Sequence, residues 1–399
     1  MKAMIAAWLA TASLITASLA TTDLAAAAPA KEIRIGMITT FTTAVGSVGK
    51  AARQGVDLAL KRLGDKMDGI PVKVFYADDG GKPALAKSKT DELILQDHVD
   101  FIIGYNFSNM LLAAYNSAMG AKVFTFSLNA GPKNIAGEDC SPYFFAIGHQ
   151  NDMEARGIGE VLNRRNIHSL YLVAPNYAAG VEMVNGVKST FKGKVLGQSL
   201  TKWPDQLEFS AEISQIQATN PEAVFIFLTT RYAVQFMNQF NQAGLKDRIP
   251  VYSVATFDQF NLNVVGPMSI GSYATNYWVQ DLDAPANKTF VAAYKKTYGG
   301  DVAGNAVAGY DAVNLIDSAV RAVKGDISDK AAVHAALKKA DFASVRGRFS
   351  FSANQFPVED IYLQQVARDD KGEIVLKTVG KAVEQIQSDA PTACHMPAL

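Results

Sequence analysis

Residues 33–38, Ile-Arg-Ile-Gly-Met-Ile, open a pattern in which short apolar and β-branched runs alternate with longer amphipathic stretches. This run predicts a strand, and apolar residues at helical spacing over 49–63 predict the helix that follows it. The pattern continues with a strand at 72–76, a helix at 83–96 and a short buried strand at 99–103. Repeated β-α-β-α order is typical of a doubly wound parallel sheet, so the sequence predicts an α/β fold.

A helix at 109–119 and a strand at 122–127 extend this first sheet, and the alternation begins again after residue 149. The second sheet is expected to have strands at 169–174, 223–228 and 251–254, with helices at 154–165, 180–191, 208–218 and 233–243. Helices return at 286–298, 306–323 and 329–339, followed by antiparallel strands at 347–351, 361–367 and 373–379. We therefore predict two doubly wound lobes joined by a multi-crossing hinge, with lobe 1 formed by 31–148 and 279–345 and lobe 2 by 149–278 and 346–399, whose tail returns to the hinge.

Length and composition agree with two globular lobes. The chain has 399 residues, of which 49% are hydrophobic and 19% charged. Lys+Arg and Asp+Glu both total 38, so no charge excess steers the protein to a polyanion. Nucleic acid is therefore not an expected partner.

The N-terminus has the features of an export signal. Lys2 precedes an apolar run over 4–20, and small residues around Ala28-Pro29-Ala30 offer cleavage sites. A membrane anchor is the alternative, but the run is rich in Ala and Thr and Asp23 interrupts the stretch that follows. We expect residues 1–30 to be removed and the mature, periplasmic protein to start near Lys31.

Two cysteines are present, Cys140 and Cys394. In an exported protein an even count favours a disulfide, which would hold the C-terminal tail. The alternative is a pair of free thiols, although Cys394 lies in a polar tail where burial would not protect it. Their spacing excludes a Cys-x-x-Cys redox or zinc motif.

Catalytic and cofactor motifs are not recognisable. The five histidines lack metal-binding spacing and are each expected to be exposed or hydrogen-bonded: His98, His149, His168, His334 and His395. The segment 46–50, Gly-Ser-Val-Gly-Lys, has two residues between its glycines where a phosphate-binding loop needs four. No Gly-x-Gly-x-x-Gly follows an expected strand. We therefore expect neither a metal nor a cofactor, and no enzyme activity.

Several short segments follow one another along the chain in a characteristic order. They are 36–60 with Gly49 and Gly55, Phe-Ile-Ile-Gly at 101–104 followed by Ser108, 126–131, Tyr177 with Gly180, 228–232, and Gly-Tyr-Asp-Ala at 309–312. In this order and spacing the chain resembles type I periplasmic binding proteins of the leucine/isoleucine/valine class over nearly its whole mature length. The resemblance implies a receptor that closes two lobes on a small molecule and delivers it to the permease subunits of an ABC importer.

Strand ends and helix N-termini that face the cleft supply the ligand contacts in such a fold. By the resemblance, the expected contacts are Ser47, Val48, Tyr105, Asn106, Ser108, Ser127, Asn129, Ala130, Gly131, Tyr177, Thr229, Thr230, Arg231, Ala255 and Phe257. Ser108 could cap its helix, hold a ligand carboxylate, or do both. Asn129 and Gly131 could also form an ordinary turn.

Departures from the amino-acid-binding relatives bear on the ligand. Gly131 stands where the resemblance implies Thr, and no acid occupies the position near Ala255 that would face a ligand ammonium. A buried ammonium without a counter-charge is costly. Arg231 could grip a carboxylate, although a solvated arginine is the plainer alternative. If an amino acid does bind, the missing acid would be Asp258 or Asp311.

Two further features favour an aromatic ligand. Tyr105, Phe107, Tyr177 and Phe257 could wall a flat molecule, although each could equally be core. The stretch from 129–132 to 140–145 also resembles a subgroup associated with aromatic carboxylates. The leading hypothesis is thus a monomeric receptor for an aromatic acid without an α-amino group. The alternatives are a receptor for branched-chain or other hydrophobic amino acids, and a ligand sensor uncoupled from import.

Overall fold

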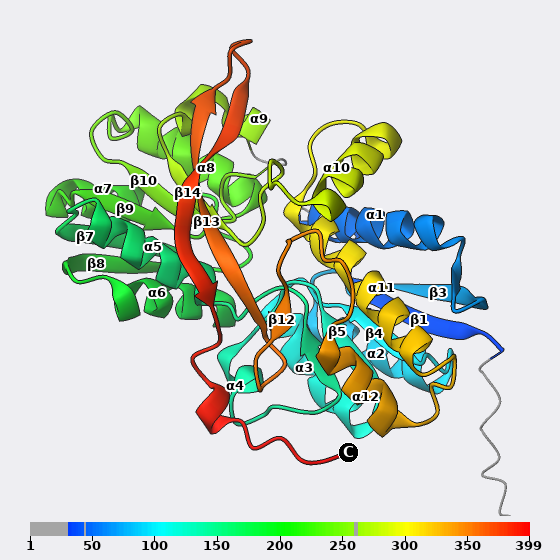
Figure 1. Ribbon diagram of the computed structural model, residues 1–399. Coiled ribbons are helices and arrows are strands. Elements are labelled where there is room, and N and C mark those ends of the chain that lie inside the picture. Colours follow the sequence, from blue (N-terminus) through cyan, green and yellow to red (C-terminus); the bar gives the residue numbers. More distant parts are fainter. Residues whose placement is uncertain (1–30, 44, 259–261) are drawn as a thin grey trace, which may run out of the picture.

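The computed structural model describes residues 31–43, 45–258 and 262–399, which form two lobes that each contain one sheet (Figure 1). The predicted export signal, 1–30, falls outside these described residues. Each sheet has a doubly wound parallel core, so the predicted α/β class is confirmed. Within the described ranges, no helix combines the length and apolar character needed to cross a membrane.

The first sheet has the strand order β2-β3-β1-β4-β5-β6. Its strands from β3 to β6 are parallel, and Ile35 at the centre of β1 pairs with both β3 and β4. The strands are β1 (Ile33–Thr39), β2 (Lys66–Met67), β3 (Ile70–Asp78), β4 (Phe101–Gly104), β5 (Phe124–Ser127) and β6 (Phe144–Ala146). Between them lie α1 (Gly46–Leu63), α2 (Pro83–Leu95), α3 (Ser108–Gly120) and α4 (Lys133–Ala136).

The second sheet has a parallel core, β8-β7-β9-β10-β11, extended by the antiparallel strands β13 and β14. Its strands are β7 (Ser169–Pro175), β8 (Lys194–Thr201), β9 (Ala223–Ile226), β10 (Val251–Val254), β11 (Tyr273–Asn276), β12 (Ser350–Phe351), β13 (Pro357–Arg368) and β14 (Ile374–Ile386). The helices of this part are α5 (Met153–Arg164), α6 (Ala178–Thr190), α7 (Ser210–Thr219), α8 (Thr230–Gln242) and α9 (Leu262–Val265).

The chain then returns to the first lobe with α10 (Pro285–Tyr298), α11 (Gly304–Ala322) and α12 (Lys330–Lys339). In Figure 1, α10 and α11 lie beside α1, and α12 packs against α11 on the side away from α1. Close packing requires glycine here, since a Cβ on Gly55 of α1 would stand 1.9 Å from the Ala306 carbonyl oxygen of α11. Helix α11 is almost entirely buried and forms part of the lobe core. Three segments therefore connect the lobes: 147–152, 277–284 and 340–356. The exact residue limits of the two moving units stay a prediction.

Four strands, β2, β6, β8 and β11, are absent from the expected pattern. β2 and β6 are only two and three residues long, β11 has the weakly apolar sequence Tyr-Ala-Thr-Asn, and β8 is a sheet-edge strand with mostly half-exposed side chains. The tail strand expected at 347–351 is reduced to the two residues of β12. The remaining expected strands and helices have counterparts with ends shifted by a few residues.

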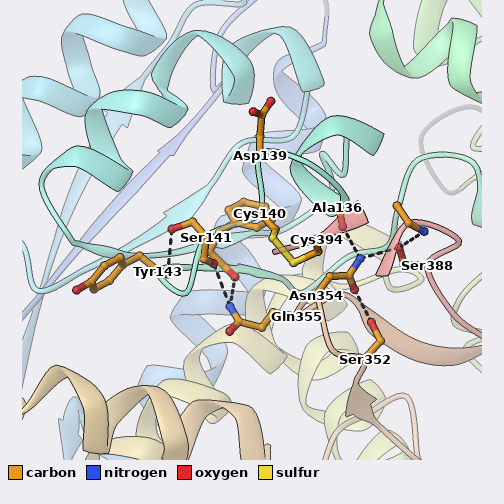
Figure 2. Close-up of a disulfide and its surroundings, with 12 residues drawn as sticks. Ala136, Asp139, Cys140, Ser141, Tyr143, Ser352, Asn354, Gln355, Ser388 and Cys394 are labelled. Carbon is orange, nitrogen blue, oxygen red and sulfur yellow. Dashed lines mark hydrogen bonds between the residues drawn. A yellow bond between two sulfur atoms is a disulfide. The ribbon is translucent and has the colours of Figure 1, made fainter. Parts of the chain in front are cut away.

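The C-terminal tail is bonded to the first lobe by a disulfide between Cys140 and Cys394, as Figure 2 shows. The predicted bridge is confirmed. Beside it, Asn354 Nδ2 donates to the Ala136 carbonyl at 2.6 Å and to Ser388 Oγ at 2.8 Å. The tail that follows β14 is therefore held to the α4 region by covalent and hydrogen bonds.

Candidate functional site

A cavity of about 70 Å³ lies between the two lobes, at the carboxyl ends of strands from both sheets. Lobe 1 contributes loops after β4 and β5, lobe 2 contributes loops after β7, β9 and β10, and the 147–152 connection forms the hinge side. The lining residues are Val48, Asn106, Phe107, Ser108, Asn129, Ala130, His149, Asn151, Glu154, Tyr177, Ala179, Met183, Phe227, Thr229, Val254, Ala255, Asp258 and Asn305.

Two larger hollows, of about 860 and 840 Å³, lie elsewhere on the molecule. The first is lined by residues of α1, α10 and α11, and the second by residues of α10, β11, β13 and β14. Neither is placed at the carboxyl ends of both sheets, where a doubly wound fold gathers helix N-termini. The smaller interlobe cavity is therefore the candidate site.

Ser108 is the first residue of α3 and supplies a hydroxyl to the lobe 1 side of the cavity. Its Oγ accepts a hydrogen bond from Asn151 Nδ2 at 3.0 Å. Because Asn151 is the donor, the Ser108 hydroxyl keeps its own proton for another acceptor. The N-cap of α3 is Phe107, which makes no side-chain capping bond, so Ser108 is not the cap of this helix. The positive end of a 13-residue helix thus faces the cavity.

Asn106 contributes a buried amide without a partner. The residue is 2% exposed, and neither Oδ1 nor Nδ2 has a hydrogen-bond partner among the described residues. Its backbone carbonyl, in contrast, accepts from Asn129 Nδ2 at 2.8 Å, which fixes the two loops together. Leaving a buried polar group unpaired costs about 1–3 kcal/mol, so this amide marks a place where a polar ligand group would be stabilised.

The hinge side of the cavity carries His149 and Glu154, each 4% exposed. His149 Nε2 lies 3.5 Å from Glu154 Oε2, and the imidazole packs 5.3 Å from the Tyr277 ring. Burial, with a contribution from the Arg346 charge, lowers the pKa of His149 to about 4. Burial and the nearby Glu359 raise the pKa of Glu154 well above its usual value. The imidazole is therefore uncharged at neutral pH, and burial opposes ionisation of the Glu154 carboxyl.

Aromatic rings cover the lobe 2 side. Tyr177 stacks on Trp203 with ring centroids 5.2 Å apart and on Phe227 at 6.5 Å. Phe107, from lobe 1, reaches the same cluster at 6.0 Å from Trp203. Such rings offer flat apolar surface to a ligand and join the two lobes at the cavity.

Polar contacts also cross between the lobes. Glu182 of α6 accepts from Asn151 Nδ2 at 2.7 Å and from the Lys133 backbone N–H at 3.1 Å. Asn151 Oδ1 in turn accepts from the Gly131 N–H at 2.9 Å. Together with the Phe107–Trp203 contact, these bonds define a closed arrangement of the lobes.

Of the residues expected from the sequence, the cavity brings together Val48, Asn106, Ser108, Asn129, Ala130, Tyr177, Thr229 and Ala255. Ser47, Tyr105, Ser127, Gly131, Arg231 and Phe257 are not among its lining. Thr230 begins α8. The assignment of these residues as ligand contacts stays a prediction.

The residues outside the lining have other partners. The Tyr105 hydroxyl bonds Thr90 Oγ1 at 2.7 Å inside lobe 1, and Ser127 Oγ donates to the Ala130 carbonyl. The Arg231 guanidinium is exposed and lies over the Tyr232 ring at 5.2 Å from its centroid. Phe257 is buried.

Gly131 is required by close packing. A Cβ at this position would stand 1.9 Å from the His149 carbonyl oxygen, so no side chain fits. The absence of Thr here therefore does not leave an open place at the ligand, because the 147–152 connection takes up the space.

Two sequence expectations need correction. The cavity does contain acidic side chains, because Glu154 and Asp258 line it, whereas Asp311 is bonded to Ser344 and Arg346 away from it. His149 is neither exposed nor fully hydrogen-bonded, since its Nδ1 has no partner in the described part of the chain. Other lining residues are not expected from the sequence: Asn151, Ala179, Met183, Phe227, Val254 and Asn305. His149 and Asn151 lie in the 147–152 connection, directly after the carboxyl end of the short strand β6. Recognition of β6 as a strand would have indicated that these residues lie at the site.

Comparison with known proteins agrees with this architecture. The family model described as periplasmic binding protein matches residues 32–373. Leu/Ile/Val-binding protein homolog 6 of Brucella suis biovar 1 (strain 1330) is 25% identical over 357 residues, covering 87% of this chain and 91% of the relative. The predicted resemblance to this class is confirmed.

Solved structures give the same result. A solute-binding protein of an ABC transporter from R. palustris, in complex with benzoate, is 28% identical with a TM-score of 0.85, covering 91% of this chain and 99% of that chain. A solute-binding protein of an ABC transporter from Rhodopseudomonas palustris BisB5, in complex with 3,4-dihydroxy benzoic acid, is 26% identical with a TM-score of 0.81, covering 90% and 99%. From the match over most of its length and from its two-lobed fold, this chain belongs to the periplasmic binding protein family.

Proposed function

We propose that the protein is an exported solute-binding receptor of an ABC importer, and that it closes its lobes on an aromatic carboxylate lacking an α-amino group. The observation that carries the ligand class is the unpartnered amide of Asn106 beside Ser108 and the N-terminus of α3. Hydroxyl and amide donors at a helix N-terminus stabilise a carboxylate without a metal. The ring would lie against Tyr177 and Phe227, and binding rather than catalysis is the proposed role.

The closed contacts suggest how the ligand controls the receptor. Groups from both lobes line the cavity, so they can contact one ligand together only when the lobes are closed. A ligand that binds the closed state more tightly shifts the population toward it. We propose that a monomer in this state, in the periplasm, is recognised by the permease subunits of the importer, with no cofactor or nucleic acid involved.

A receptor for branched-chain or other hydrophobic amino acids is the second candidate. Glu154 and Asp258 favour it, because an ionised carboxylate in the cavity could pair with a ligand ammonium. Against it, burial and the nearby Glu359 raise the pKa of Glu154 well above its usual value, which opposes its ionisation. We therefore place the aromatic acid first. A ligand sensor uncoupled from import would use the same cavity.

Calorimetry with matched pairs tests the ligand class. Phenylpropionate is expected to bind about a hundredfold more tightly than phenylalanine, and benzoate more tightly than leucine, because an ammonium must be desolvated and burial opposes the ionisation of Glu154 that would pair with it. A thermal-shift screen of both classes gives the same order, since a ligand of the native state raises apparent stability. Tighter binding of the amino acids would overturn the proposal in favour of the second candidate.

Ser108→Ala is expected to weaken binding of the aromatic acid by about tenfold to a hundredfold, the usual effect of losing a hydrogen bond to a charged group. The far-ultraviolet spectrum and the unfolding midpoint should stay close to wild type, because Ser108 does not cap α3. Ser88→Ala is the matched control, since Ser88 is an exposed residue of α2 that does not line the cavity. Equal affinities for the two variants would remove Ser108 from the binding site.

A further inference from the structure

The hinge end of the cavity is polar, buried and incompletely hydrogen-bonded. His149 Nδ1 has no partner among the described residues, although the side chain is almost fully buried. The other ring nitrogen, Nε2, lies 3.5 Å from Glu154 Oε2, which is longer than a good hydrogen bond. Buried polar atoms are nearly always paired, so this end of the cavity retains unused hydrogen-bonding capacity.

The surroundings decide what kind of group could use it. Arg346 donates to the Gly148 carbonyl at 3.4 Å, directly before His149, and its charge opposes protonation of the imidazole. Glu154 faces Glu359 and the Tyr277 backbone N–H, and burial together with Glu359 raises the pKa of Glu154 well above its usual value. His149 therefore presents a neutral imidazole with one donor and one acceptor nitrogen, and the Glu154 oxygens can accept a hydrogen bond in either protonation state.

We propose that His149 and Glu154 form a second polar subsite that recognises a hydroxyl group on the ring of the bound acid. This inference rests on the proposed function, because it assumes that the carboxylate occupies the Ser108 end. The preferred ligands are thus hydroxylated aromatic carboxylates rather than benzoate itself.

A hydroxyl fits the subsite better than the other common ring substituents. It can donate to one nitrogen or oxygen and accept from the neighbouring group, so both residues gain a partner. A methyl group of similar size would leave His149 Nδ1 buried and unpaired. A second carboxylate would lie against Glu154 and Asp258, and would be repelled by any ionised acid there.

The test is calorimetry of the full-length mature protein with benzoate, 3- and 4-hydroxybenzoate, and 3- and 4-methylbenzoate. We expect at least one hydroxybenzoate to bind roughly tenfold more tightly than benzoate and than the methylbenzoate substituted at the same position. His149→Leu should reduce this hydroxyl preference to about one. His149→Gln keeps an acceptor and should retain part of the preference.

The control is His168→Leu, which removes an exposed histidine far from the cavity lining and should keep the wild-type preference. If the wild-type protein binds benzoate and the hydroxybenzoates equally, or if His149→Leu keeps the preference, the subsite proposal is wrong while the proposed function stands. If leucine binds and no benzoate derivative does, the proposed function itself has failed. A His149→Leu variant that does not fold leaves the wild-type comparison of hydroxyl with methyl as the deciding result.

Discussion

Arg346→Leu is expected to lower the free energy of unfolding by about 3–5 kcal/mol, the range measured when one partner of a buried ion pair is removed. Arg346 is 5% exposed, and its Nε donates to Asp311 Oδ2 at 3.2 Å. A second nitrogen, Nη1, donates to Glu359 Oε2 at 3.0 Å. Replacement by leucine leaves Asp311 buried without a counter-charge.

The large effect follows from where the partners lie. Asp311 lies in α11 of lobe 1, Glu359 lies in β13 of lobe 2, and Gly148 lies in the 147–152 connection. Arg346 belongs to the 340–356 connection and thus bonds it to the 147–152 connection. Burial raises the pKa of Glu359 to about 8, so at neutral pH the main charge pair is Arg346 with Asp311.

Urea unfolding of the variant measures the effect, and α11 offers a matched control. Arg321 pairs with Asp317 at 3.0 Å, but the arginine side chain is 55% exposed. Arg321→Leu should therefore cost no more than about 1 kcal/mol. A similar loss for the two variants would mean that the buried pair contributes no more than a surface pair, and the hinge argument would be wrong.

The parts of the fold that could be predicted from the sequence are those with strong local signals. The expected strand at 33–38 corresponds to β1 and the expected helix at 83–96 to α2, because their apolar spacing matches one period over many residues. β6 could not be predicted because three residues have no period to detect, and β11 could not because its sequence, Tyr-Ala-Thr-Asn, lacks the valines that mark β10. β8 could not be predicted because an edge strand needs few apolar residues and so has a weak sequence pattern.

The site follows the same division. Asn106, Ser108 and Asn129 were predictable because they follow recognisable strands, and the carboxyl ends of parallel strands meet at one edge. His149 and Asn151 follow β6, the undetected strand, so their place at the cavity was hidden. Glu154 looks like an ordinary first-turn acid of α5. Its neighbours include Tyr277 and Glu359, which lie more than a hundred residues away in the chain.

The disulfide gives the second large effect. The Cys140→Ala/Cys394→Ala variant is expected to lose about 5 kcal/mol of unfolding free energy on the chain-entropy model, within a measured range of about 2–5 kcal/mol for native bridges. The reason is the separation of 254 residues, which makes the bridge a strong restriction on the unfolded chain.

The folded tail should stay in place without the bridge, because it has other contacts. Lys133 Nζ pairs with Asp389 at 2.7 Å, and Asn354 bonds Ser388 as Figure 2 shows. The stability loss should therefore arise mainly in the unfolded state, and the affinity for the ligand should stay near wild type. The same loss is expected when the wild-type protein is unfolded in a reducing agent.

Urea unfolding with and without reductant measures this effect, and intact-mass analysis after alkylation establishes the starting state. The bridged wild-type protein should take up no alkylating agent, and the reduced protein should take up two. The urea dependence should be steeper for the reduced protein and for the double variant, because an uncrosslinked unfolded chain exposes more surface. If the double variant unfolds at the wild-type midpoint, or if reductant lowers its stability further, the bridge is not the source of the stabilisation and the tail contacts around Asp389 and Asn354 carry it instead.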